Sequence, residues 1–174
     1  MIVFRHADPS FPFLWEDASQ PPARWHGAGD GPVQYFCDTP DGAWAEFLRH
    51  EEIKHPADLA TVRRALWAVE LPDEPAEPAR LPDATLFGGT RSHPDCQAEA
   101  RRLRDLGAKR LVAPSAALAA GGAGGHRVDG GLRPGPPRDG KVIVVFGRQP
   151  ELAWWAAAGE GRPRDDLLPR VRHF

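Results

Sequence analysis

The strongest hydrophobic pattern in the chain is the run KVIVVF at 141–146, in which apolar β-branched residues follow one another without a polar break. A continuous run of this kind is typical of a strand buried on both faces, so it predicts a central strand of a sheet. A second strand is predicted at 33–38, because Val33, Tyr35 and Cys37 recur at every second position and share one face. The pattern therefore indicates a chain built around a sheet.

Other strands are predicted from shorter apolar segments, at 2–7, 64–71 and 110–117 and, as candidate edge strands, at 152–155 and 167–172. The segment 110–117 meets proline at Pro114, which cannot donate to a strand ladder. The strand therefore delivers Ser115 to its end, a position where functional side chains are common.

A helix is predicted to begin at Thr39, which can serve as N-cap with Pro40 in the first helical position. Apolar and functional residues then recur at intervals of three and four as far as His50. The interval of four places Glu46 and His50 on neighbouring turns of this helix. A single helical turn is predicted after it, at 56–59.

A second long helix is predicted over 92–107, from the spacing of its apolar residues. Ala100, Leu103 and Leu106 are expected to pack against the core. Gly107 is expected to end the helix, because glycine adopts the left-handed conformation that follows many helices.

Two stretches lack the pattern of either element. The first contains prolines at 72, 75 and 78 and is predicted to be a surface excursion. The second, 119–140, is rich in glycine and proline and has little apolar content. It is predicted to be a mobile loop or lid.

Length and composition fit one domain over residues 1–174, because 174 residues with 41% hydrophobic content can bury a substantial core. The formal net charge is −2, so the chain has no bulk basic field to attract a nucleic acid. Cys37 and Cys96 have no spacing typical of a zinc or dithiol site and are expected to be packing residues in a reducing compartment. No apolar run approaches the roughly 20 residues that span a bilayer. A cytoplasmic protein without membrane contact is expected.

Several motifs in order carry a family resemblance: Arg24-Trp25, Tyr35 eleven positions after Arg24, Glu46 eleven positions further and preceded by Ala45, and Pro114-Ser115-Ala116 at a strand end. Together they resemble the RES domain, which is named for its Arg, Glu and Ser. The resemblance runs from Phe4-Arg5 to Arg170-Val171-Arg172, essentially the whole chain. Many members have glycines before the Arg-Trp pair, an asparagine after it and a tyrosine after the first arginine, whereas this chain has Pro22-Ala23, His26 and His6 there.

The resemblance implies an α+β fold of the compact ADP-ribosyltransferase-like kind, with a mixed central sheet flanked by helices. It also implies an enzyme that degrades NAD with phosphate or water as acceptor, as the toxin of a type II toxin–antitoxin pair. NAD would be a substrate rather than a cofactor, with inorganic phosphate as a co-substrate. The implied partner is an antitoxin with a DNA-binding domain, which would make any DNA contact, and a second copy of the chain is a further candidate.

Two other functions remain open at this point. Some members of the family resemble ADP-ribosyltransferases that modify a protein target. A member without catalysis would use the same pocket as a nucleotide-binding or partner-binding module. Free nicotinamide released from NAD would separate the enzymes from the binding module.

The resemblance implies that Arg24, Tyr35, Glu46 and Ser115 are the catalytic residues and that Arg5, His6 and His50 bind substrate. The residue types suit this chemistry. Cleavage of a nicotinamide glycosidic bond develops positive charge on the ribose, which a carboxylate can stabilise. Planar guanidinium groups give two-pronged contacts to a pyrophosphate or to an attacking phosphate.

Structural interpretations of the same residues also remain. Arg24 could be a surface arginine, and Glu46 with Arg49 and His50 could form an ordinary solvated helix face. Tyr35 could be a core tyrosine with a satisfied hydroxyl, and Ser115 could cap a turn. The other histidines have no helical pairing that indicates a metal, so no metal site is predicted.

Overall fold

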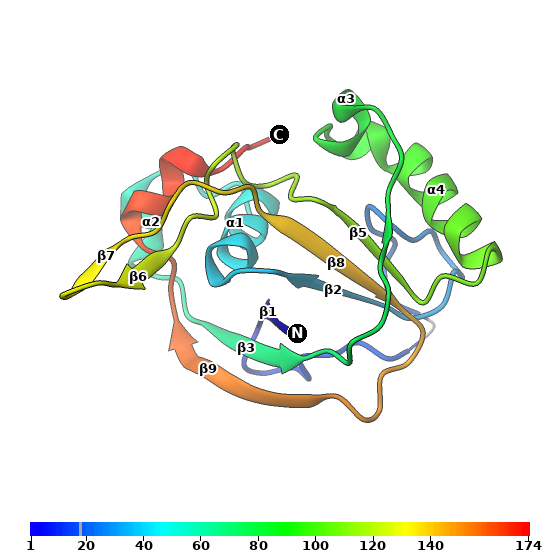
Figure 1. The fold of residues 1–174 in the computed structure, drawn as a ribbon, viewed down its shortest axis with the longest axis horizontal. Coiled ribbons are helices and arrows are strands. Elements are labelled where there is room, and N and C mark those ends of the chain that lie inside the picture. The colour runs from blue at the N-terminus through cyan, green and yellow to red at the C-terminus, as the bar shows by residue number, and fades with distance from the viewer. Residues whose placement is uncertain (18) are drawn as a thin grey trace.

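The computed structural model describes residues 1–17 and 19–174 and contains a seven-stranded sheet. Its strands are β1 (Ile2–Ala7), β2 (Val33–Cys37), β3 (Arg64–Glu70), β4 (Glu77–Pro78), β5 (Arg110–Pro114), β8 (Lys141–Phe146) and β9 (Ala153–Gly161). The spatial order is β4-β5-β8-β2-β1-β3-β9 (Figure 1). All neighbours are antiparallel except β4 and β5, which are parallel, so the predicted mixed sheet is confirmed.

The strand β8 lies inside the sheet, between β5 and β2, and its four middle residues are buried. This confirms the prediction of a central strand from the apolar run. The strands β1, β2 and β3 also form where they were predicted. In the view of Figure 1, β1 and β3 lie lower than β2 and β8.

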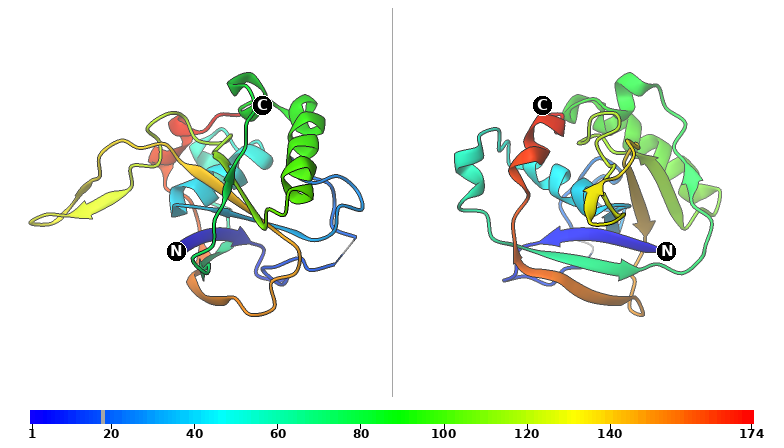
Figure 2. Two further views of the ribbon diagram at one scale, coloured as in Figure 1. Left: turned by 45° about the vertical axis from the view of Figure 1, so that its right-hand side comes forward. Right: turned by 60° about the vertical axis from the view of Figure 1, so that its left-hand side comes forward.

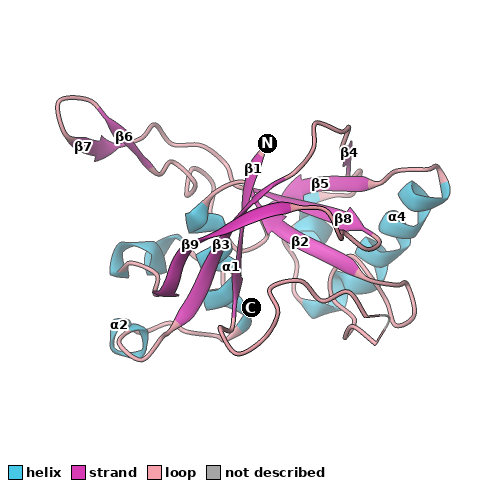
Figure 3. Cartoon of the chain, turned by 90° about the horizontal axis from the view of Figure 1, so that it is seen from below, coloured by secondary structure: helices cyan, strands magenta, loops and turns pink. Residues whose placement is uncertain are grey.

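The helices lie in two groups (Figure 1). They are α1 (Pro40–His50), α2 (Pro56–Leu59), α3 (Asp83–Leu86), α4 (His93–Asp105) and the 3-10 helices η1 (Thr90–Ser92) and η2 (Asp165–Arg170). Helix α1 contacts β1, β2 and η2, while α3 and η1 contact α4. Figure 3, seen from below, shows α4 beside β5 and β8 and α1 beside β1 and β3.

Helix α1 begins as predicted. Thr39 has an extended backbone and its side chain accepts a hydrogen bond from the amide of Gly42, while Pro40 occupies the first turn. The inward face of the helix carries Trp44 and Leu48, which are buried in a core cluster. The cap and this apolar face together fix the direction in which the helix presents Glu46.

Each face of the sheet packs against a different part of the hydrophobic core. Leu103 of α4 packs with Leu111 of β5 and Val144 of β8. On the other side, Val3 and Phe36 pack with Phe13 from the loop after β1. Cys37 and Cys96 are buried and free, which confirms their prediction as packing residues.

Helix α4 is close to its prediction, but one of its core residues was wrong. Gly107 has a φ of 89°, the left-handed conformation expected after the helix. Leu106, which was expected to pack, is 74% exposed, because the chain turns away at this residue. Among the described residues, no helix is long and apolar enough to cross a membrane.

Two predictions need correction, those for the glycine-rich stretch and for the segment 167–172. The proline-rich excursion is exposed, as predicted, and it also forms the edge strand β4, which pairs with Leu111 and Val112. The glycine-rich stretch contains a hairpin of β6 (His126–Val128) and β7 (Leu132–Pro134), which projects from the body in Figure 2. The segment 167–172 lies largely in η2 rather than in a strand. The strand predicted from residue 110 stops at Pro114, as expected. Backbone pairing forms the β6–β7 hairpin although the apolar content of the segment was too low to predict a strand.

Candidate active site

A pocket of about 330 Å³ opens between β1, β2, α1, the end of β5 and the start of α4. Six of the seven predicted site residues line it: Arg5, His6, Arg24, Tyr35, Glu46 and His50. The remaining wall is formed by Phe4, Pro22, Ala23, Trp25, Cys37, Ala43, Arg49, His93, Pro114, Ala116, Val142 and Phe174. Residues up to 170 positions apart in the sequence, Phe4 and Phe174, therefore meet at one cavity.

Ser115 lies directly behind the pocket wall, buried and bonded to Glu46. Its hydroxyl donates to Glu46 Oε1 over 3.2 Å. Ser115 Oγ also accepts hydrogen bonds from the amides of Ala117 and Leu118, each at 3.2 Å. Ser115 therefore does cap the turn after β5, as the structural interpretation suggested, and it also holds the carboxyl group of Glu46.

The carboxyl group of Glu46 is surrounded by protein on most sides. Burial raises its pKa, while the charge of Arg49 and the hydrogen bond from Ser115 act in the opposite direction. Because burial dominates, Glu46 binds a proton more readily than an ordinary glutamate. Its ionised form is the one that would stabilise positive charge in the pocket.

Arg49, one turn after Glu46, was not predicted as a site residue. It is 3% exposed, so the interpretation of Arg49 as part of a solvated helix face was wrong. Its Nη1 donates to the carbonyl oxygens of Ala116 and Arg172, and its guanidinium lies 4.5 Å from the ring centroid of Phe174. Arg49 therefore joins α1 to the end of β5 and to the last residues of the chain.

Arg24 is anchored to the end of α3 and to the segment that follows it. Its Nη1 donates to the carbonyl oxygens of Thr85 and Leu86, each at 3.3 Å, and to Ser92 Oγ at 3.2 Å. Its Nη2 donates to the carbonyl oxygen of Gly88 at 2.6 Å. Arg24 is thus a pocket residue whose terminal nitrogens already have protein partners, unlike the free surface arginine of the structural interpretation.

The carbonyl oxygen of Gly88 accepts from two arginines. Arg24 Nη2 lies 2.6 Å from it and Arg49 Nη2 lies 2.9 Å from it. A Cβ atom at Gly88 would lie 2.8 Å from the carbonyl oxygen of Ala84 and 2.9 Å from Ser92 Oγ, so glycine is required here by close packing. This carbonyl fixes the wall formed by α3 and η1 against α1.

The hydroxyl of Tyr35 is occupied by the loop before β2. It accepts the amide of Trp25 at 2.9 Å and lies 2.8 Å from His26 Nδ1. His26 Nε2 lies 2.8 Å from the carbonyl oxygen of Pro21, which can only accept, so Nε2 carries the proton and Nδ1 accepts from Tyr35. Burial lowers the pKa of His26 and raises that of Tyr35, which keeps both neutral.

Arg5 and His6 come from β1. Arg5 Nη1 donates to Gln34 Oε1 over 2.6 Å, and Gln34 in turn donates to the carbonyl oxygen of Trp15 at 2.5 Å. Burial lowers the pKa of Arg5 to about 10, so it stays charged at neutral pH. Burial and neighbouring positive charges lower the pKa of His6 to about 3, and its Nδ1 is buried without a partner among the described residues.

Two histidines stand at the pocket rim. His50, at the end of α1, is exposed and was predicted. His93, the first residue of α4, was not predicted. Burial and the charges of Arg24 and Arg49 lower the pKa of His93, which favours its neutral form. No group of three metal-ligating side chains occurs in residues 1–17 and 19–174.

The residues that sequence reasoning missed are mainly those that support others. Arg49 and His26 hold loops, Gln34 holds Arg5, and His93 stands beside an arginine. The spacing of three between Glu46 and Arg49 was a usable signal, because it puts both side chains on one helix face. The contacts of Gln34 and His26 depend on loops whose paths the sequence pattern does not define.

The pocket at the mixed sheet combines the carboxyl group of Glu46 with three arginines, Arg5, Arg24 and Arg49, and is the candidate active site. The RES domain family matches residues 2–128, and the chain belongs to this family. The chain is also similar to a chain in the crystal structure of the M. tuberculosis MbcT–MbcA toxin–antitoxin complex, with 13% identity and a TM-score of 0.57. The likeness covers 91% of this chain and 84% of the other. No curated protein matches the chain in sequence.

Proposed function

We propose that this chain cleaves the bond between nicotinamide and ribose in NAD, with phosphate or water as acceptor. We further propose that it is the toxin of a type II toxin–antitoxin pair. Membership of the RES domain family supports the chemistry, and the likeness to a toxin–antitoxin complex supports the biological role. The observation that carries the proposal is the position of Glu46, on the pocket wall with its carboxyl group held by Ser115.

Glu46 supplies the negative charge that this reaction needs. As the glycosidic bond breaks, positive charge grows on the ribose ring, and a fixed carboxylate stabilises that charge without having to move. The hydrogen bond from Ser115 holds the carboxyl group, and this bond and the charge of Arg49 both favour its ionised form. Nicotinamide leaves as a neutral molecule, so the site needs no general acid.

The arginines supply the complementary positive charge for the phosphates. Arg5 makes one side-chain hydrogen bond in the described structure, to Gln34, and its remaining N–H groups can bind a pyrophosphate or an inorganic phosphate. Arg24 and Arg49 already bond to carbonyl oxygens, so they act mainly through their charge and by fixing the pocket wall. Arg5 is therefore the direct phosphate ligand in this proposal.

The size of the pocket suggests which end of NAD enters it. About 330 Å³ is at the lower end of the range for small-molecule sites. The nicotinamide and its ribose fit such a volume, and the adenosine half then lies over the rim, near His50 and His93. The apolar surfaces of Phe4 and Trp25 offer contacts for the nicotinamide ring.

The test is to incubate the purified chain with NAD, with and without inorganic phosphate, and to identify the products. Free nicotinamide is expected in both cases if water is an acceptor, and only with phosphate if phosphate is required. Glu46→Gln is expected to lower turnover by at least about 100-fold while NAD still binds, because the amide keeps the shape but loses the charge. Glu51→Gln, an exposed neighbour after α1, is the matched control and should keep full activity.

Each alternative function has its own outcome in this assay. Binding of NAD without release of nicotinamide would contradict catalysis and favour a binding module. Transfer of labelled ADP-ribose to a protein in an added lysate would favour an ADP-ribosyltransferase. Full turnover in Glu46→Gln would remove Glu46 from the mechanism.

The proposed partner is an antitoxin that covers the pocket and carries its own DNA-binding domain. A net charge of −2 gives the chain no strong general attraction for DNA or for a charged partner, so shape-matched contacts at the pocket are expected. Expression of the chain alone should lower cellular NAD and arrest growth, and Glu46→Gln should abolish both effects. Harmless expression with unchanged NAD would contradict the toxin role.

A further inference from the structure

The sheet has one long free edge, formed by β9. At the opposite end the edge strand β4 has two residues, and one of them, Pro78, has no N–H to offer. Strand β9 has nine residues, and those from Ala153 to Ala157 are all exposed. Figure 2 shows β9 at the rim of the molecule in both views, with no segment beyond it.

This edge lacks the usual protection against pairing. Free edges in soluble proteins commonly carry lysine, proline or a bulge that prevents another strand from adding. The stretch LAWWAAAG at 152–159 contains no charged residue and no proline. The irregularities of β9 begin after Ala156, whereas 153–156 run in continuous register with β3 from Glu70 to Trp67. The regular and uncharged part of the edge is therefore open.

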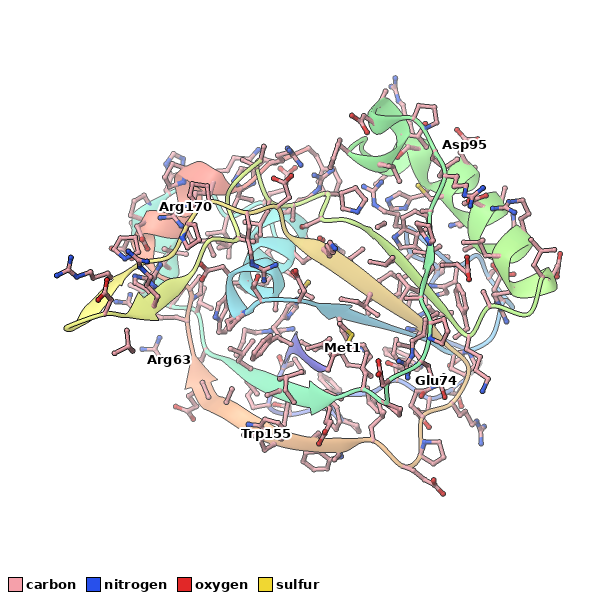
Figure 4. The ribbon with its side chains drawn as sticks, in the orientation of Figure 1. Met1, Arg63, Glu74, Asp95, Trp155 and Arg170 are labelled. Carbon is pink, nitrogen blue, oxygen red and sulfur yellow. The ribbon has the colours of Figure 1, made fainter. Side chains whose placement is uncertain are left out.

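Exposed aromatic residues accompany this part of the edge. Trp154 is 50% exposed and Trp155 is 47% exposed. The ring of Trp154 lies 4.8 Å from that of Phe13, and the sequence neighbourhood of Phe13 includes Phe11 and Trp15, which are also exposed. Apolar clusters of this kind on a soluble protein mark protein–protein contacts. Figure 4 shows Trp155 on the outer side of β9.

We propose that two copies of the chain pair edge to edge through 153–156, antiparallel about a two-fold axis at Trp155. In this arrangement Trp155 lies opposite Trp155 of the second copy, and Trp154 lies opposite Ala156 of the second copy. The two residues of each facing pair then point to the same face of the joined sheet, as antiparallel pairing requires. The backbone N–H and C=O groups of the two edges then complete a continuous fourteen-stranded sheet, twice the seven strands of one copy.

A second copy fits this edge better than a different partner does. Identical charged strands repel one another when they pair, but the segment 153–156 carries no charge, so pairing with itself has no such cost. The same lack of charge gives the edge no electrostatic means of selecting a foreign strand. The facing pair of Trp155 side chains adds a cross-strand aromatic contact on one face of the joined sheet.

The paired edge does not block the candidate active site. None of the residues that line the pocket comes from β9. The pocket lies beside α1, β5 and the start of α4, while β9 is the outermost strand at the far end of the sheet (Figure 1). Pairing and catalysis can therefore be tested separately.

The test is sedimentation velocity from low to high micromolar concentration, combined with hydrogen exchange. The wild-type chain is expected to form a particle of about 38 kDa, twice the chain mass of 19.0 kDa, and amide exchange at 153–156 should slow as the dimer forms. Trp155→Lys should be monomeric, because it brings positive charge to the axis. Ala156→Lys is a second variant that leaves both tryptophans in place. Leu106→Lys, which also replaces an exposed apolar residue but lies after α4, should still dimerise.

A wild-type chain that stays monomeric over this range would overturn the proposal. So would a dimer in which the amides of 153–156 exchange as fast as in the monomer, or a dimer that survives both folded lysine variants. Nicotinamide release by Trp155→Lys should equal that of the wild type at the same chain concentration. Failure of the NAD assay would leave the dimer intact, and failure of the dimer would leave the NAD assay unchanged.

Discussion

At Glu46 the surroundings act on one carboxyl group in opposite directions. Burial raises its pKa, and Arg49 and Ser115 lower it again without cancelling the effect. The ionised form is the one that stabilises a ribosyl cation, and burial makes this form less favourable than in an ordinary glutamate. Catalysis by this site should therefore be sensitive to acid.

We predict that turnover falls on the acid side at a higher pH than the pKa of an ordinary glutamate. Ser115→Ala removes a hydrogen bond that lowers the pKa of Glu46, so it should shift this acid limb to still higher pH. The measurement is kcat/KM for nicotinamide release against pH, with the exposed Ser10→Ala as control. An acid limb that Ser115→Ala leaves unmoved would show that Glu46 does not set it.

The same pKa shift predicts a dependence of stability on pH. The folded state binds a proton at Glu46 more tightly than the unfolded state, so this group lowers stability as pH rises from the ordinary glutamate pKa to the folded pKa. Glutamine at position 46 cannot ionise, so the Glu46→Gln variant does not lose this stability as pH rises. Its stability in urea should therefore exceed that of the wild type at neutral pH, and the difference should shrink in acid. A glutamine variant less stable at neutral pH would contradict the direction of the shift.

Tyr35 is a residue for which structure and family resemblance suggest different roles. Its hydroxyl already serves Trp25 and His26, so Tyr35→Phe should destabilise the fold by about 1–3 kcal/mol by leaving buried partners unpaired. The His26→Ala change should be non-additive with it, because both break one hydrogen bond. Urea denaturation of the two single variants and the double variant measures this coupling. Additive losses would mean that the two residues act independently.

At the scale of elements, α3 and η1 form a wall that depends on one backbone carbonyl. Gly88 offers its oxygen to Arg24 and Arg49 and has no room for a side chain. Since both arginines line the pocket, displacement of this carbonyl would move them as well. The wall and the pocket charges are therefore coupled through Gly88.

We predict that Gly88→Ala destabilises the chain by about 1–3 kcal/mol through overpacking and weakens NAD binding. Gly89→Ala is a close control, because a Cβ there meets only the Phe174 ring at an ordinary 3.5 Å. Thermal unfolding and calorimetric titration with NAD measure the two effects. Equal behaviour of the two variants would show that the crowding at Gly88 relaxes without consequence.

The elements that sequence reasoning predicted well are those with a local cause. Thr39 and Pro40, together with the next two residues, are enough to define the start of α1. The continuous apolar run of β8 indicates a buried strand without knowledge of its neighbours in the sheet. The start of α1 also fixed the register that puts Glu46 on the pocket wall. Local signals of this kind made the backbone of the site predictable.

The elements that were missed depend on distant partners. Strand β4 exists because Glu77 and Pro78 lie beside β5, and η2 forms where a strand was expected because it packs against α1. Leu106 was placed inward by helical spacing, but the chain leaves the helix at that residue. Contacts between segments far apart in sequence leave no periodic pattern, so the sequence could not indicate them.

At the scale of the whole molecule, Arg49 joins segments that are far apart in the chain. From α1 it bonds to the carbonyl oxygens of Gly88, Ala116 and Arg172, and it lies over the ring of Phe174. These contacts bring the α3 wall, the end of β5 and the last residues of the chain to one point. Arg49 therefore stabilises the pocket wall and also holds the last residues of the chain against the rest of the molecule.

We predict that Arg49→Lys lowers the free energy of unfolding by about 2–4 kcal/mol, because one ammonium group cannot reach three carbonyl oxygens on separate segments. Hydrogen exchange should increase together at 87–89, 116–118 and 170–174, since all three lose a shared partner. Arg63→Lys is the matched control, because Arg63 is exposed and bonds to the carbonyl oxygens of Ala60 and Val62 in its own loop. If exchange rose in one segment alone, Arg49 would be a local contact, and the pocket wall and the tail would be stabilised independently of each other.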